Sequence, residues 1–220
     1  MTITWYGQSC FRIDTREGVV AIDPFGKAIG LTPPRFHADI LLVTHAHPDH
    51  ANTAAIPGTP ALVTGPGEYE LRGLAIQGIA TFHDAKGGHE RGSNTTFRIA
   101  IASEDIVLVH LGDFGEEAMR EETLEAIGDV DILMIPVGGT YTVDGETAAK
   151  IVHQIEPRVV IPMHYALPGL SIKLAPVEPF LNSYGAPPTG GSERLTKLVI
   201  RKRDVSEGAT RVVVLAASGA

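Results

Sequence analysis

The sequence predicts a single α/β domain built from two β-sheets with helices outside them. The first half of the chain is typical of β-strands separated by turns, whereas the second half alternates strands and helices. The 220 residues, 44% of them hydrophobic, fit one domain with a sizeable buried core. We therefore expect residues 1–220 to form one domain in which the two sheets pack together.

Short alternating or apolar runs, bounded by turn residues, predict the strands of the first half. The expected strands are residues 2–6, 10–14, 19–22, 39–43, 61–63, 74–79, 95–102 and 106–111. The second and third of these should pair as a hairpin around residues 15–18. A short helix is expected at 51–55, and the polar, glycine-rich residues 83–94 should form a loop.

Helices and strands alternate in the second half of the expected fold. Helices are predicted at 116–127, where Glu, Ala, Met and Leu are frequent, at 145–155 with Asp144 as N-cap, and at 177–181. Strands are predicted at 131–137, 159–163, 195–202 and 210–216, and the last two should close as a hairpin.

Composition limits the classes of partner and the compartment. The formal net charge of −8 does not favour a broad nucleic-acid surface. The single cysteine, Cys10, allows no intrachain disulfide. The chain begins without the basic and apolar regions of a signal peptide, and no apolar run approaches the roughly 20 residues of a membrane helix. We expect a cytoplasmic protein that acts on a small molecule and does not bind membranes; the sequence does not indicate its oligomeric state.

The run Thr44-His45-Ala46-His47-Pro48-Asp49-His50 is the strongest functional signal. Three imidazoles and a carboxylate follow directly on the apolar strand 39–43, where packing alone does not explain them. Imidazole and carboxylate ligands together suit zinc and its neighbours among the transition metals. Water on such an ion ionises near neutral pH and becomes a nucleophile. The run therefore predicts a metal-dependent hydrolase.

Further potential ligands follow other predicted strands. His83, Asp113 and His164 each stand where an apolar run gives way to a loop. Strand ends are the positions from which open sheets build their sites. His110 lies three residues before Asp113, on the strand itself, and is expected to support the site or pack in the core.

These motifs, in this order, resemble the metallo-β-lactamase-fold hydrolases over essentially the whole chain. Within that superfamily, the chain is similar to the small bacterial and archaeal branch that includes the ascorbate-6-phosphate lactonases. The resemblance to this branch rests on Ile3-Thr4-Trp5-Tyr6-Gly7, His83-Asp84 with Arg91-Gly92-Ser93-Asn94-Thr95, His110-Leu111-Gly112-Asp113 and Ile161-Pro162-Met163-His164-Tyr165. The resemblance implies a four-layer αββα sandwich.

The resemblance also implies a site for two divalent metal ions. One ion would be held by His45, His47 and His83, and the other by Asp49, His50 and His164. Asp113 would bridge the two ions, so Asp49 and Asp113 are the predicted catalytic carboxylates. Zinc is the expected metal, with manganese and iron as alternatives. Asp23 would support the histidine loop by accepting hydrogen bonds.

Three functions fit this site. The first is hydrolysis of a small ester or lactone by a hydroxide that bridges the two ions, and the second is hydrolysis of a phosphodiester. The third is a metal-binding scaffold with little turnover. Arg91 is a candidate contact for an anionic substrate or an ordinary solvated loop arginine, and Tyr141 either lines the substrate cleft or packs on its own loop.

Overall fold

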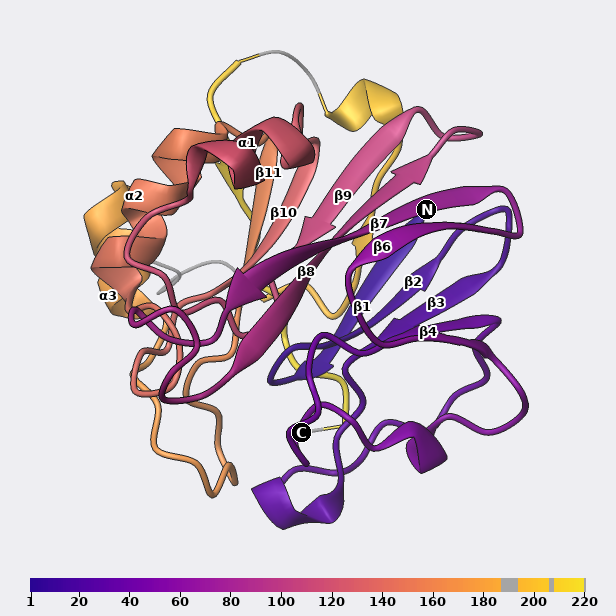
Figure 1. Ribbon diagram of the computed structural model, residues 1–220, viewed down its shortest axis with the longest axis horizontal. Helices are drawn as coiled ribbons and strands as arrows, with labels where there is room; N and C mark the ends of the chain where they lie inside the picture. The colour runs from indigo at the N-terminus through magenta and orange to yellow at the C-terminus, as the bar shows by residue number, and fades with distance from the viewer. Residues whose placement is uncertain (187–193, 206–207, 220) are drawn as a thin grey trace.

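The computed structural model describes residues 1–186, 194–205 and 208–219, which form two packed β-sheets (Figure 1). The first sheet combines strands from the beginning and the end of the chain. Its six strands, side by side, are β12 (Leu198–Val199), β1 (Thr2–Gly7), β2 (Cys10–Asp14), β3 (Val19–Ile22), β4 (Ile40–Leu42) and β5 (Ala61–Val63). Strands β1, β2 and β3 are antiparallel, whereas β3, β4 and β5 are parallel.

The second sheet takes its strands from the middle and the end of the chain. Its seven strands, side by side, are β13 (Arg211–Val212), β11 (Val159–Met163), β10 (Ile132–Pro136), β9 (Ile106–His110), β8 (Ser93–Ile101), β7 (Leu74–Phe82) and β6 (Gly67–Leu71). Strands β9, β10, β11 and β13 are parallel, and β6 to β9 pair antiparallel. Strands β7, β9 and β11 therefore all end at the same edge of the sheet.

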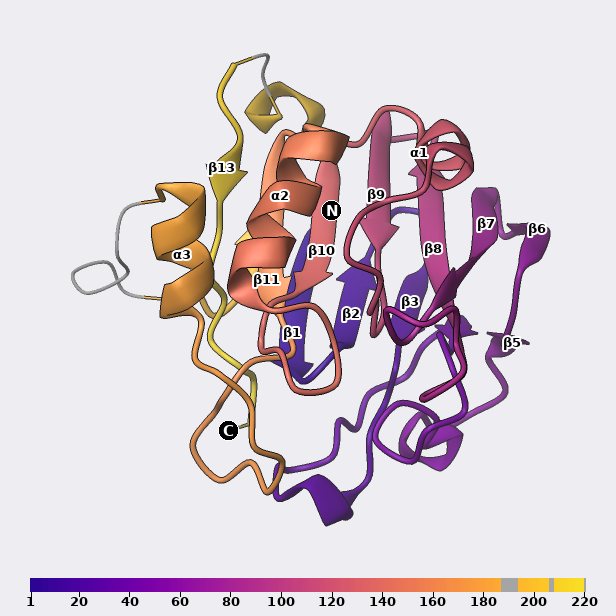
Figure 2. The same cartoon turned by 60° about the vertical axis from the view of Figure 1, so that its left-hand side comes forward.

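The outer layers of the sandwich differ in thickness. Helices α1 (Glu121–Ile127), α2 (Gly145–Ile155) and α3 (Glu178–Tyr184) cover the outer face of the seven-stranded sheet (Figure 2). The other sheet is covered by loops that carry the 3₁₀ helices η1 (Lys27–Ile29) and η2 (Thr53–Ala55), and a third, η3 (Lys202–Asp204), follows β12. The two predicted central sheets with outer layers are thus confirmed, and the outer layer is thin on the side of the first sheet. None of the helices in the described part of the chain has the length and apolar character needed to cross a membrane.

Alternating side chains of the two sheets bury the main core between them. Ile3, Trp5 and Phe11 of the first sheet belong to the same buried cluster as Phe97 and Leu108 of the second. A smaller cluster, built around Leu41 and Phe36, lies under the loops on the outer face of the first sheet. Strand β4 contributes to both clusters, which is why residues 40–42 are apolar without alternation.

Most of the predicted elements are confirmed, and two differ within the first 130 residues. Residues 67–71 form the edge strand β6, which was not predicted because its alternation uses two glutamates and a tyrosine. The predicted helix 116–127 begins only at Glu121. The preceding residues instead make tertiary contacts: Phe82 N–H donates to Glu116 Oε1, and Met119 N–H donates to Gln154 Oε1. Tertiary hydrogen bonds thus override local helix propensity here.

The predicted C-terminal hairpin is wrong. Strand β12 pairs antiparallel with β1 in the first sheet, whereas β13 pairs parallel with β11 in the second. The two segments approach each other only at a parallel bridge between Leu195 and Leu215. Each segment adds to the edge of a sheet formed by earlier parts of the chain. The local sequence does not indicate which edge a strand will join.

Asp144 is confirmed as the N-cap of α2, and its side chain accepts a hydrogen bond from Thr147 N–H at 2.8 Å. This hydrogen bond lowers the pKa of Asp144. We expect Asp144→Ala to lower the free energy of unfolding by about 1 kcal/mol, and Asp144→Asn by less. Because the folded-state pKa is the lower one, the carboxylate's contribution is present above the unfolded-state pKa and is lost as pH falls through the folded-state value. Urea unfolding of wild type and both variants at neutral and acidic pH measures it.

Candidate metal centre

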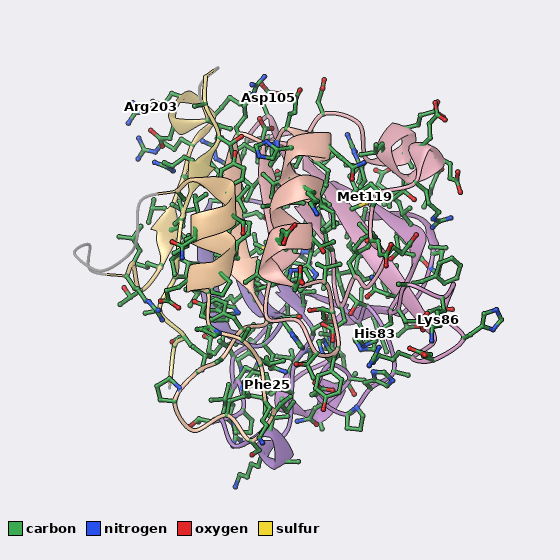
Figure 3. The ribbon with its side chains drawn as sticks, turned by 90° about the vertical axis from the view of Figure 1, so that its left-hand side faces the viewer. Phe25, His83, Lys86, Asp105, Met119 and Arg203 are labelled. Atoms are coloured by element: carbon green, nitrogen blue, oxygen red, sulfur yellow. The ribbon has the colours of Figure 1, made fainter. Side chains whose placement is uncertain are left out.

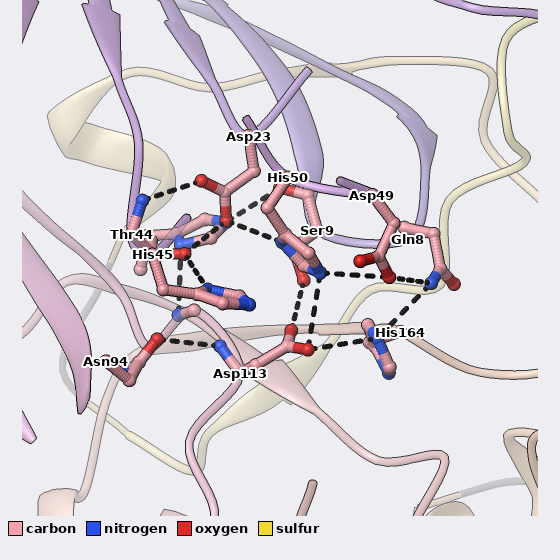
Figure 4. Close-up of polar contacts among 12 residues, drawn as sticks. Gln8, Ser9, Asp23, Thr44, His45, Asp49, His50, Asn94, Asp113 and His164 are labelled. Carbon is pink, nitrogen blue, oxygen red and sulfur yellow. Dashed lines mark hydrogen bonds and ion pairs between the residues drawn. The ribbon is translucent and has the colours of Figure 1, made fainter. Parts of the chain in front are cut away.

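The predicted ligands lie together at one edge of the sandwich, where strands of both sheets end. Asp23 follows β3, the histidine run follows β4, His83 follows β7, Asp113 follows β9 and His164 follows β11. In Figure 3, His83 lies in the lower half of the molecule, away from Asp105 and Arg203 at its top. Figure 4 shows side chains from both sheets converging on Asp113.

Asp23 and Thr44 fix the histidine loop (Figure 4). Asp23 Oδ1 accepts from Thr44 N–H at 2.8 Å, and Asp23 Oδ2 accepts from Thr44 Oγ1 at 2.7 Å and from His50 Nδ1 at 3.1 Å. Since the Thr44 hydroxyl donates to Asp23, it accepts from His45 Nδ1, 2.9 Å away. The neutral forms of His45 and His50 therefore carry their proton on Nδ1 and present Nε2 as the atom that can bind a metal ion.

The potential ligand atoms form three overlapping groups, each with its atoms within 4.8 Å of one another. The groups are His45 with His47 and His83, His45 with His50 and Asp113, and Asp49 with His50 and His164. Asp113 Oδ2 lies 3.2 Å from His50 Nε2, 3.3 Å from His164 Nε2 and 3.4 Å from His83 Nε2. One carboxylate oxygen thus faces histidines of both predicted metal sites.

Burial and mutual charge set the protonation of this cluster. Burial, reinforced by repulsion from His50, lowers the pKa of His45 to about 3. Burial opposes ionisation of Asp113, but attraction to His164 and His50 outweighs it and holds the pKa of Asp113 well below its usual value. At neutral pH, His45 is therefore neutral and Asp113 is a carboxylate, the forms that bind cations.

Ser9 and Asn94 orient Asp113. Ser9 Oγ donates to Asp113 Oδ1 at 3.1 Å, which leaves Oδ2 to face the histidines. Asn94 Oδ1 accepts from Asp113 N–H at 3.0 Å. Gly112 adopts φ +61°, and a Cβ there would lie 2.3 Å from Asn94 Oδ1, so the turn that presents Asp113 requires glycine.

His110 has both ring nitrogens engaged, away from the cluster. Its Nδ1 accepts from Gly112 N–H at 3.1 Å, so its Nε2 donates to Ser9 O at 2.9 Å. This buried imidazole therefore connects β9 to the turn between β1 and β2 and leaves no nitrogen for an ion.

Asp84 organises the loop between β7 and β8. Its carboxylate accepts four backbone N–H groups, those of Lys86, Gly88, Glu90 and Arg91. Burial opposes its ionisation, but these donors outweigh burial and lower the pKa of Asp84 to about 2. The loop in turn presents Arg91, whose Nη2 donates to Thr140 O at 3.2 Å and whose guanidinium lies 5.8 Å from the centre of the Tyr141 ring.

A cleft of about 450 Å³ opens onto the cluster. His47, Asp49, His83, Asp113 and His164 line its floor, and Arg91 and Tyr141 line it together with Glu90 and the apolar side chains of Ala28, Ile29, Pro48 and Ile172. Arg91 is the one lysine or arginine among the described residues that line the cleft. A second hollow, of about 490 Å³, lies at the opposite edge, near Asp105 and Lys202, and its described lining contains no histidine.

Sequence reasoning gave Asp23 and His110 a supporting role but missed the other residues that surround the predicted ligands. Gln8, Ser9, Thr44, Asn94 and Asp84 received no role, although Thr44 directly precedes the first histidine and Asp84 opens a polar, glycine-rich loop. Those two positions offered a signal, because Asp and Thr side chains at the start of such segments commonly bond nearby backbone groups. Gln8, Ser9 and Asn94 meet the site only through contacts between distant parts of the chain.

The residues present fit a metal ion. The Nε2 atoms of His45 and His50 are buried and have no hydrogen-bond partner among the described residues. Buried polar atoms normally have a partner, and a bound ion is one explanation for the exceptions. The separations of 3.2–3.4 Å between the atoms around Asp113 match those between ligands of one ion, since bonds of about 2.0–2.2 Å to tetrahedral zinc place the ligands about 3.3–3.6 Å apart.

Comparison with known proteins assigns the family. Residues 2–164 match the family model described as the β-lactamase superfamily domain. A UPF0173 metal-dependent hydrolase of Thermoplasma acidophilum is 30% identical over 194 residues, covering 75% of this chain and 83% of the relative. The corresponding protein of Thermoplasma volcanium is 32% identical over 197 residues, covering 74% and 82%.

A solved structure gives the same answer. The crystal structure of a proposed zinc-dependent hydrolase of the metallo-β-lactamase superfamily from Thermotoga maritima is 31% identical, with a TM-score of 0.75, and 97% of each chain is covered. The sandwich and its histidine–aspartate cluster thus define a metallo-β-lactamase-fold protein. The chain belongs to the β-lactamase superfamily and, within it, to the UPF0173 metal-dependent hydrolases.

Proposed function

We propose that this protein is a binuclear metal-dependent hydrolase of small esters or lactones that carry an anionic group. The observation that carries the proposal is the position of Asp113 Oδ2, within 3.4 Å of the Nε2 atoms of His50, His83 and His164 at the floor of an open cleft. Zinc is the metal we propose for both sites, with manganese or iron as alternatives.

The side chains divide into two sets of ligands. His45, His47 and His83 would hold one ion; Asp49, His50 and His164 would hold the other; and Asp113 would serve both. Two such ions supply an activated water near neutral pH and polarise the oxygen of the bond under attack. Asp23, Thr44 and Ser9 keep the ligand atoms aimed at the cleft through the hydrogen bonds described above.

The cleft favours a small substrate with one charged end. Its volume of about 450 Å³ suits a small molecule. Ile29, Ile172 and Tyr141 offer apolar surface, and Arg91, whose side chain is 35% exposed, offers a cation for a carboxylate or phosphate group. Because Asp84 and Thr140 already hold Arg91 in place, little conformational freedom is lost when an anion binds.

Parallel assays test the proposed reaction. Metal-loaded protein should hydrolyse members of a lactone and ester set, lose this activity with a chelator and regain it when zinc or manganese is returned. Turnover of a phosphodiester set alone would replace this proposal with phosphodiester hydrolysis. No turnover of either set by protein that does bind metal would favour the metal-binding scaffold, and less than about one ion per chain after loading would refute both hydrolase functions.

Arg91→Ala should reduce kcat/KM for anionic substrates by about 10- to 100-fold, mainly through KM, because a charge-assisted hydrogen bond is lost. Neutral substrates of the same size should be affected little, and Arg91→Lys should retain part of the effect. Arg203→Ala, at the opposite end of the molecule, is the matched control (Figure 3). Equal losses on anionic and neutral substrates would assign Arg91 a purely structural role.

A further inference from the structure

Gln8 lies in the turn between β1 and β2, directly beside the predicted ligands Asp49 and His164. It is fully buried and adopts φ +48°, a conformation that non-glycine residues seldom take. Its backbone oxygen accepts from Trp5 Nε1 at 2.9 Å and from His164 N–H at 3.1 Å. The turn is therefore fixed against the strand end that presents His164.

The Gln8 side chain points at two predicted ligands (Figure 4). Its Nε2 lies 3.4 Å from Asp49 Oδ2 and 3.3 Å from His164 Nε2, while its Oε1 is buried without a partner among the described residues. A strained backbone and an unsatisfied buried oxygen both destabilise the fold. Together they indicate a role for Gln8 other than packing.

The Gln8 carboxamide is as far from its neighbours as the predicted ligand atoms are from one another. Asp49 Oδ2 and His50 Nε2 are 3.4 Å apart, and His50 Nε2 and Asp113 Oδ2 are 3.2 Å apart. The end of Gln8 stands at the same separation from its two neighbours. An amide nitrogen does not bind a cation, but its oxygen does, and rotating the carboxamide by half a turn exchanges the two atoms. Without a cation the N–H groups face the two acceptors, whereas a cation between these residues favours the oxygen.

We propose that Gln8 Oε1 is a further ligand to the ion held by Asp49, His50, His164 and Asp113, an inference that rests on the metal centre proposed above. An amide oxygen is a hard ligand, so it would favour manganese, one of the alternatives to zinc named above, at this site. The two sites then differ in kind: the site of His45, His47 and His83 presents imidazoles, whereas the site beside Gln8 adds oxygen ligands and a higher coordination number.

Metal titration of the stripped protein tests this role without an activity assay. In wild type, we expect two equivalents of Mn²⁺ or Co²⁺ to bind. Gln8→Met, which keeps the length of the side chain but removes the oxygen, should weaken one of them by about 10- to 100-fold and leave the other unchanged. The visible bands of bound Co²⁺ should gain intensity, because that ion has lost a ligand. Gln8→Glu should restore tight binding, and Gln77→Met, on β7 away from the centre, is the control for the substitution itself.

Every outcome of the titration decides the role of Gln8. Unchanged affinity and unchanged Co²⁺ bands in Gln8→Met would overturn it and leave the binuclear proposal intact. A single equivalent in wild type would overturn the binuclear proposal, and Gln8→Met would still decide whether Gln8 contacts that ion. If Gln8→Met fails to fold, Gln8→Glu decides: tighter binding of one equivalent than in wild type, expected when an anionic oxygen replaces a neutral one in the coordination shell, supports ligation, and affinity equal to or below that of wild type overturns it.

Discussion

Replacement of Asp113 by alanine is expected to reduce bound metal and hydrolysis together, with kcat/KM falling by at least about 10³-fold. Asp113 Oδ2 faces His50, His83 and His164, so its removal takes an anionic ligand from both proposed sites. The remaining imidazoles are uncharged ligands, so no carboxylate charge is left between the two sites to offset the positive charge of the ions. Elemental analysis and steady-state kinetics on the same preparation measure the two losses.

Two further variants make the Asp113 result specific. Asp113→Asn preserves the shape of the side chain and should lower metal content nearly as much, because the charge is lost. Asp105→Asn, at an exposed position on the opposite end of the molecule, should match wild type (Figure 3). Full activity in Asp113→Ala would refute the role of Asp113 as a ligand shared by two ions.

Removal of the Asp23 carboxylate is expected to have the second largest effect, although Asp23 is not a proposed ligand. Asp23→Ala deprives Thr44 N–H, Thr44 Oγ1 and His50 Nδ1 of their acceptor inside a fully buried site. We expect metal affinity to fall by about 10- to 100-fold, because the imidazoles of His45 and His50 lose their fixed orientation. We also expect the free energy of unfolding to fall by about 2–4 kcal/mol, because buried donors are left unpaired.

Calorimetric metal titration and urea unfolding of the metal-free protein separate the two effects of Asp23. Asp23→Asn keeps an oxygen for Thr44 N–H and should be the more stable of the two variants, while still disturbing His50. Wild-type metal affinity in Asp23→Ala would mean that the fold orients His50 without this carboxylate.

The sequence could predict which side chains gather at the centre, because each follows an apolar strand. Residues 40–43 are apolar without a break, and the histidine run begins two residues later, so its place at a sheet edge could be inferred. His83, Asp113 and His164 follow strands that run in the same direction, which brings them to the same edge. The two-sheet architecture followed from the change in element pattern between the two halves of the chain.

What could not be predicted depends on contacts between distant residues. Gln8 and Ser9 read as an ordinary turn, and only the packing of the first sheet against the second brings them to His164 and Asp113. The same reason explains the error at the C-terminus, where β12 and β13 add to edges formed by β1 and β11. Local patterns indicate that a strand forms, but pairing partners are chosen by the edges that the rest of the chain leaves open.

The position of the centre at the seam between the sheets links metal uptake to folding. Asp23 and the histidine run belong to the first sheet, and His83, Asp113 and His164 belong to the second. In the unfolded chain these donors are dispersed over more than a hundred residues, so an ion has a compact binding place only after the sheets have met. An ion bound there is held by side chains of both sheets and therefore keeps the two sheets together. Each tenfold excess of free ion over its dissociation constant then adds about 1.4 kcal/mol to the free energy of unfolding, so metal supply in the cell would set how long the protein survives as well as how fast it works.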